Sequence, residues 1–356
     1  MRHPPLGPGQ IDAPHRDASL GDLALESGET IRDFHQSYVT HGTLDADRSN
    51  AILACISLTG THHRLDFLIG PGKALDTDRY FVVAADAIGG GLTTSPSLST
   101  LQPRSLFPRF GLRDMIHAQH RLLTEVIGLD QVHAVVGASM GGMQVLQWGV
   151  SHPGFMRKLV AMTPMARTAP WAAMVVRTAR ACLMADPAWN GSEFTAIPER
   201  GWRAYASLMT AMMTFTPAAL ADADVDAWSQ RALATQTASG LDAHDYLYQS
   251  WAYEAHDVGK TPGFGNDTLR ALAAIRAATL VLAPPLDLFN PESSAREAAS
   301  AIPRARFVEI PSIQGHQAAT NTDSRDASFL NAVIGEFLAE YPKIHASYPQ
   351  NPGAPL

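Results

Sequence analysis

The chain has 356 residues, of which 46% are hydrophobic and 17% are charged, a balance typical of globular proteins with a sizeable core. Its formal net charge is -7 and its isoelectric point is near 6.0. Because the chain is acidic and contains no basic run, composition argues against a surface built to bind nucleic acid or an anionic membrane.

The two cysteines and the first residues bear on where the protein works. Cys55 and Cys182 lie far apart in no ligand-like spacing, so we expect two thiols rather than a disulfide. Residues 1–16 are polar and rich in Pro and His, without the apolar stretch of a signal peptide. No apolar run reaches the roughly 18–20 residues that a membrane helix needs. The sequence therefore predicts a cytoplasmic protein.

The first half of the chain predicts an arm followed by a buried sheet. Residues 1–20 are expected to form a flexible arm. The continuous apolar runs Ile52–Ile56 and Tyr80–Ala85 are typical of strands that are buried on both faces. Apolar residues recur every three to four positions between 112 and 127, which predicts a helix. The other expected elements are strands at 34–41, 51–57, 79–85 and 132–136 and a helix at 141–152.

The second half predicts an insertion and then a return to the same sheet. Residues 166–262 are rich in Ala, Met and Trp with helical periodicity, so we expect a helical lid. The core would then comprise residues 21–165 and 263–345. These patterns predict an α/β protein with a mostly parallel, doubly wound sheet. The remaining expected elements are strands at 279–283 and 306–310, a helix at 328–340 and a flexible tail at 346–356.

The strongest local signal for chemistry is the G-x-S-x-G pentapeptide Gly137-Ala138-Ser139-Met140-Gly141. It lies between a buried strand and a helix, the setting in which such a serine forms a strained turn as a nucleophile. Glycine is needed beside the serine because a Cβ would collide with the adjacent strand or helix. A glycine-rich turn that contains a serine by chance is the alternative interpretation.

A serine nucleophile needs a base, and the base needs an orienting carboxylate, in the chain order Ser, Asp or Glu, His. Asp287 and His316 each lie just past a predicted strand, at the edge where open α/β sheets bind ligands. Glu292 is the rival acid, although it is better placed to begin the next helix. His133 lies within a strand and is expected to pack in the core.

The oxyanion of an acyl-transfer reaction needs two N–H donors. We expect them from the backbone of Met140, after the nucleophile, and of Leu58, in the loop after an earlier strand. His62 and His63 follow closely, but no third metal ligand lies at useful spacing, so they are predicted to be solvated loop histidines. Gly89–Gly91 is predicted to be a flexible loop, because it does not match the dinucleotide-binding pattern.

Several segments together resemble the homoserine O-acetyltransferase branch of the α/β hydrolases, over about residues 30–340. The resemblance implies a core with a helical lid, a ping-pong mechanism through an acyl-serine and a homodimer formed through the lid. The matching segments are Leu58–Gly60, Gly70–Phe81, Arg113–Met115, Gly137–Gln144 and Asp287–Phe289.

The family's amino-acid-binding positions differ in this sequence. Gln317 follows the catalytic histidine where the family has an acidic residue, and a neutral amide cannot pair with a substrate ammonium group. Ser207 replaces an expected lid arginine, and Gly90–Pro96 departs from the family's Gly-Cys loop with its Ser-Thr-Gly-Pro sequence. The predicted substrate pocket consists of Thr59, Trp171, Ser207 and Gln317.

These features predict a serine carboxylesterase that hydrolyses small acyl esters, such as acetates, through acylated Ser139. An acyl-CoA-dependent O-acyltransferase of the homoserine type, with the same three residues, is the alternative. A non-enzymatic protein with a relic site is the third class. We expect a small-molecule ester as substrate and no metal or redox cofactor, nucleic acid or membrane as partner.

Overall fold

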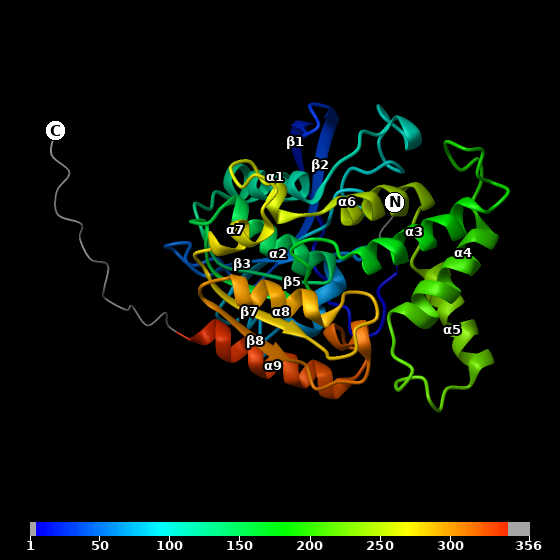
Figure 1. Cartoon of the computed structure of the whole chain (residues 1–356). Coiled ribbons are helices and arrows are strands. Elements are labelled where there is room, and N and C mark those ends of the chain that lie inside the picture. Colours follow the sequence, from blue (N-terminus) through cyan, green and yellow to red (C-terminus); the bar gives the residue numbers. More distant parts are fainter. Residues whose placement is uncertain (1–4, 341–356) are drawn as a thin grey trace, which may run out of the picture.

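The computed structural model describes residues 5–340, which form one eight-stranded sheet wrapped by helices (Figure 1). The strand order is β1-β2-β4-β3-β5-β6-β7-β8. Strands β3 to β8 are parallel, whereas β1 and β2 pair antiparallel at one edge. The predicted mostly parallel α/β fold is therefore confirmed. The strands are β1 (Arg16–Ala24), β2 (Thr30–His41), β3 (Ala51–Cys55), β4 (Phe81–Ala85), β5 (Val132–Ala138), β6 (Met156–Met162), β7 (Ala278–Ala283) and β8 (Ala305–Glu309).

Two strands were not expected from the sequence. β1 begins at Arg16, so the prediction of a flexible arm is wrong for residues 16–20, which pair with β2. The apolar run of β6 is interrupted by Arg157 and Lys158. Lys158 is nevertheless buried, because its ammonium group donates hydrogen bonds to the carbonyls of Phe337, Leu338 and Glu340.

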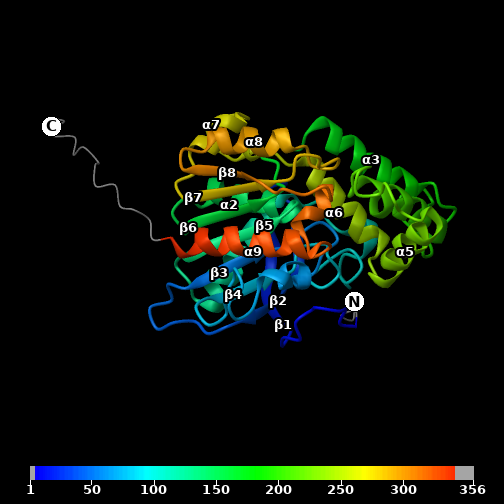
Figure 2. The same cartoon turned by 90° about the horizontal axis from the view of Figure 1, so that it is seen from below.

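Helices cover both faces of the sheet, as the continuous burial of its central strands requires. Leu53 and Cys55 face the side covered by α1, α2, α7 and α8, while Ile52 and Ala54 face α9 and the 3₁₀ segment His62–Leu68. Figure 2 shows α9 crossing in front of the strands. The predicted helix at 112–127 changes at Leu122 to a π-helical segment. These helices are α1 (Leu112–Arg121), α2 (Met140–Ser151), α7 (Thr268–Ala273), α8 (Glu292–Ala301) and α9 (Ser324–Ala339).

The chain between β6 and β7 is largely helical, and both views place α3 and α5 to one side of the sheet (Figures 1 and 2). Its segments contact the loops at the carboxyl ends of the strands. Trp171 at the start of α3 donates to the Leu288 carbonyl, and the N–H of Gln317 donates to Thr214. The helical segments are α3 (Pro170–Met184), α4 (Glu199–Tyr205), the π-helix Ala206–Met213, α5 (Val225–Ala238) and α6 (Ala243–Ala255).

The expectations for the cysteines, for membrane helices and for the tail can be compared with the described residues. Both cysteines are free thiols, Cys55 buried and Cys182 partly exposed. In the part of the chain that the structure describes, no helix has the length and apolar character to cross a membrane. The predicted tail at 346–356 lies outside the described residues.

His256, directly after α6, predicts a loss of stability in acid. Burial, assisted by the positive charges of Arg113 and Lys260, lowers its pKa from 6.5 to about 3. Below pH 6.5 this histidine is therefore protonated in the unfolded chain but stays neutral in the folded chain. The free energy of unfolding falls as the pH drops toward 3. At about pH 5 we expect this histidine alone to cost about 2 kcal/mol of the free energy of unfolding.

The measurement is urea unfolding of the wild type and of His256→Leu at about pH 7.5 and about pH 5. The variant should lose less stability on acidification, by about 2 kcal/mol. Equal losses in the two proteins would contradict the assignment.

Candidate active site

Ser139 sits in the sharp turn between β5 and α2, with a backbone φ of 58° and ψ of -123°. This left-handed conformation is strained for a residue with a side chain. The turn is possible because its neighbours are glycines. A Cβ on Gly137 would lie 2.4 Å from the carbonyl oxygen of Gly141, and one on Gly142 would lie 2.5 Å from that of Met162. The sequence-based reason for these glycines is therefore confirmed.

Three side chains that are far apart in the sequence form one hydrogen-bonded chain at this turn. The Nε2 atom of His316 lies 2.8 Å from the Oγ atom of Ser139, and its Nδ1 atom lies 2.7 Å from an oxygen of Asp287. All three residues are buried. The geometry gives a hydroxyl next to a base and a base next to an orienting carboxylate, which is what nucleophilic acyl transfer requires.

Asp287 is fixed by the loop after β7. Its second oxygen accepts hydrogen bonds of 2.8 Å from the N–H groups of both Phe289 and Asn290, which leaves the first oxygen for His316. The Asn290 side chain in turn donates to the carbonyl of Thr163, next to the nucleophile turn. The rival acid Glu292 lies elsewhere, at the start of α8, and pairs with Arg296.

The predicted oxyanion loop lies against the nucleophile turn. Residues 57–60 form a turn closed by a hydrogen bond from the Gly60 N–H to the Ser57 carbonyl. The Ser57 hydroxyl donates to the carbonyl of Ala138 at 2.7 Å and accepts from the buried guanidinium of Arg64 at 3.0 Å. Burial lowers the pKa of Arg64 to about 10, so the side chain stays positive at neutral pH. This charge favours negative charge developing nearby.

Helix α6 supports the same loop through a residue that sequence reasoning missed. The side-chain oxygen of Gln249 accepts from the N–H of Thr59 at 3.0 Å, and its amide nitrogen donates to Ile88 at 3.1 Å. Gln249 is fully buried, and Thr59 has a positive φ of 63°. No local pattern marks Gln249, because its partners lie more than 150 residues away in the chain.

The other predicted pocket residues lie in three segments of the chain. Trp171 reaches the loop of Asp287 through its bond to Leu288. Gln317 follows His316, and its side-chain oxygen accepts from the hydroxyl of Thr322 at 3.3 Å. Ser207 is exposed, and its hydroxyl donates to the Arg203 carbonyl in its own helical turn.

Three histidines outside this group are placed as follows. His133 lies in β5, stacks on Tyr80 and contacts the Leu338 carbonyl, which agrees with a packing role. The expectation that His62 and His63 are solvated is wrong: their side chains are only 4% and 5% exposed. They contact Asp86 and Asp66, so the fold supplies carboxylates that chain spacing does not reveal.

Comparison with known proteins agrees with this geometry. The sequence profile described as the α/β hydrolase fold matches residues 58–314. A homoserine O-acetyltransferase from Methanocorpusculum labreanum is 32% identical over 93% of this chain and 74% of its own length. A probable esterase from Corynebacterium glutamicum is 31% identical over 86% of this chain and 90% of its own. The solved structure of an acetylester hydrolase from Corynebacterium glutamicum superimposes with a TM-score of 0.86, at 29% identity, over 92% of this chain and 96% of that chain.

Proposed function

Since the chain belongs to the α/β hydrolases, in their homoserine O-acetyltransferase-like branch, we propose that it is a serine carboxylesterase that hydrolyses short-chain acyl esters such as acetates. The observation that carries the proposal is the hydrogen-bonded chain from Ser139 through His316 to Asp287. The acetylester hydrolase and probable esterase relatives support the same reaction class.

The proposed mechanism uses each group in turn. The Ser139 oxygen attacks the ester carbonyl and its proton passes to Nε2 of His316, while Asp287 holds the imidazole in the required tautomer. The backbone N–H groups of Met140 and Leu58 are proposed to bind the oxyanion; that of Met140 begins α2, where the first N–H groups of a helix have no acceptor within it. His316 then gives the proton to the leaving alcohol. Water, deprotonated by His316, attacks the acyl carbon; the bond to the Ser139 oxygen breaks, the acid leaves, and His316 returns the proton to Ser139.

The choice of water as acceptor rests on Gln317. This neutral side chain stands next to the catalytic histidine and offers no charge to pair with the ammonium group of an amino acid. A small neutral ester needs mainly apolar contacts, which the Met- and Trp-rich lid supplies. The proposed pocket includes Thr59, whose N–H donates to Gln249, and Trp171, which donates to the Leu288 carbonyl next to Asp287.

An acyl-CoA-dependent O-acyltransferase with the same three residues is the second candidate. The observation in its favour is the likeness to homoserine O-acetyltransferase over nearly the whole chain. Both reactions pass through the same acyl-serine, so they differ only in the acceptor that attacks it.

A homodimer through the lid is part of the proposal. Large apolar side chains are exposed there, and a partner subunit would remove them from water. They are Trp171, Met174, Ile197, Met212 and Val225.

The test is one assay with two substrates. The purified protein should release acid from ethyl acetate with water as the only acceptor, and homoserine should not stimulate thiol release from acetyl-CoA. Heat-inactivated protein serves as the control for spontaneous hydrolysis. Strong homoserine-dependent thiol release with slow ester hydrolysis would reject the esterase and favour the transferase.

A further inference from the structure

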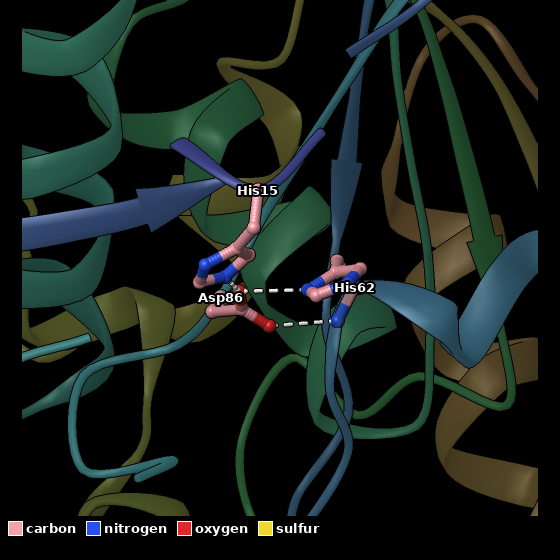
Figure 3. A group of neighbouring side chains, drawn as sticks. All are labelled: His15, His62 and Asp86. Atoms are coloured by element: carbon pink, nitrogen blue, oxygen red, sulfur yellow. Dashed lines mark hydrogen bonds and ion pairs between the residues drawn. The ribbon is translucent and has the colours of Figure 1, made fainter. Parts of the chain in front are cut away.

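A polar cluster away from Ser139 brings together three potential metal ligands (Figure 3). His15 precedes β1, Asp86 directly follows β4, and His62 begins the 3₁₀ segment His62–Leu68. Among the described residues 5–340, these are the three His, Cys, Asp or Glu side chains whose ligand atoms all lie within 4.8 Å of one another. Figure 3 shows Asp86 between the two imidazole rings.

The spacing of the ligand atoms suits a small divalent cation. One Asp86 oxygen lies 3.0 Å from Nδ1 of His62 and 3.6 Å from Nε2 of His15. Tetrahedral Zn²⁺ with bonds of about 2.0–2.1 Å sets its ligand atoms about 3.3 Å apart. Two of the three separations lie on either side of that value, and the third, between the two imidazole nitrogens, is no more than 4.8 Å, so an ion could bind with side-chain movements.

The surroundings orient the carboxylate toward the histidines. The N–H of His62 donates to the other Asp86 oxygen at 2.7 Å, and such contacts outside the ligand atoms fix ligand orientation in metal sites. The Ser37 hydroxyl contacts the Asp86 oxygen of the ligand set at 2.6 Å and Nε2 of His15 at 2.7 Å, so a bound ion would take the place of these contacts. Asp86 and His62 are 2% and 4% exposed, whereas His15 is 37% exposed, which leaves a route from solvent.

We propose that His15, His62 and Asp86 bind one divalent cation of the zinc class, with water at the fourth position. Two imidazole nitrogens and one carboxylate oxygen are a ligand set that Zn²⁺ favours over Mg²⁺ or Ca²⁺. The ion would take the place of the hydrogen bond between Nδ1 of His62 and Asp86, and the imidazole proton would move to the other ring nitrogen.

The bound ion links the segment before β1 to the loop after β3. That segment already contacts the same region, since the N–H of Ile11 donates to Asp66 at 2.8 Å. A metal would add a second attachment at His15. The role is structural and independent of the proposed esterase activity, because none of the three ligands belongs to the group at Ser139.

Zinc titration of the chelator-treated full-length protein tests the proposal. Calorimetry should give one Zn²⁺ per chain, with a rise in melting temperature. His15→Ala should weaken binding at least about tenfold, since even indirect partners of a metal site contribute that much. The matched control is His117→Ala, which removes an exposed histidine of α1 and should leave Zn²⁺ affinity unchanged.

X-ray absorption on the zinc-loaded wild type provides a second measurement that needs no variant. It should show imidazole nitrogen and carboxylate oxygen neighbours at about 2.0–2.1 Å. No Zn²⁺ uptake at millimolar concentration, sulfur or only water neighbours, or equal affinity of wild type and His15→Ala would each overturn the proposal.

Discussion

Replacing Ser139 by alanine should lower kcat/KM for the ester by about 10⁴-fold or more, because the attacking oxygen is lost. The fold should be unchanged, since the Ser139 hydroxyl bonds to His316 and the strained backbone is shaped by neighbouring glycines. The measurement is initial-rate hydrolysis of a short-chain acetate, with circular dichroism to compare the two folds.

The matched control is Ser328→Ala, which removes an exposed hydroxyl on α9 that donates to Ser324. Its activity should equal that of the wild type. Mass spectrometry after a brief reaction with an activated ester should find the acyl group on Ser139 in the wild type and no adduct in Ser139→Ala. Normal turnover by Ser139→Ala would refute the proposed mechanism.

Replacing Gly141 by alanine should produce a large loss of stability. A Cβ there would lie 2.4 Å from the carbonyl oxygen and 3.0 Å from the carbonyl carbon of Cys55. These are backbone atoms at the end of β3, which pairs with β4 and β5 and cannot move aside easily. We expect the free energy of unfolding to fall by about 3 kcal/mol or more, as measured by urea denaturation.

Gly154→Ala is the control for a glycine that has room. No heavy atom lies within 4 Å of a Cβ built there, so its free energy of unfolding should change by no more than about 0.5 kcal/mol. If Gly141→Ala were as stable as Gly154→Ala, the close contact between α2 and β3 would not be a requirement of the turn.

The strands at the centre of the sheet and the site around Ser139 were predictable because their signals are local. Strands such as β3 and β5 are continuous apolar runs, and the pentapeptide joins β5 directly to α2. Asp287 and His316 could be named because each follows a strand of a parallel sheet, whose carboxyl ends meet at one edge.

Strands that are stabilised by residues far away in the chain were hard to predict from their own residues. β1 is an edge strand with a mixed, largely exposed sequence, and its order comes from pairing with β2. β6 contains a buried lysine whose ammonium group donates hydrogen bonds to carbonyl groups at the end of α9. Neither the pairing of β1 nor the hydrogen bonds of the lysine in β6 can be predicted from the residues of the strand itself.

The sequence alone determined the fold class, the Ser139 turn and the pairing of an acid with a base, because periodicity, glycine placement and chain order are properties of neighbouring residues. Only the tertiary structure decided that Gln249 supports the loop of Thr59, that His62 is buried against Asp86, and that Ser207 is exposed. The first two contacts join segments far apart in the chain, and the exposure of Ser207 depends on which way its helix faces. Such contacts form only when burial of the apolar faces brings the elements together.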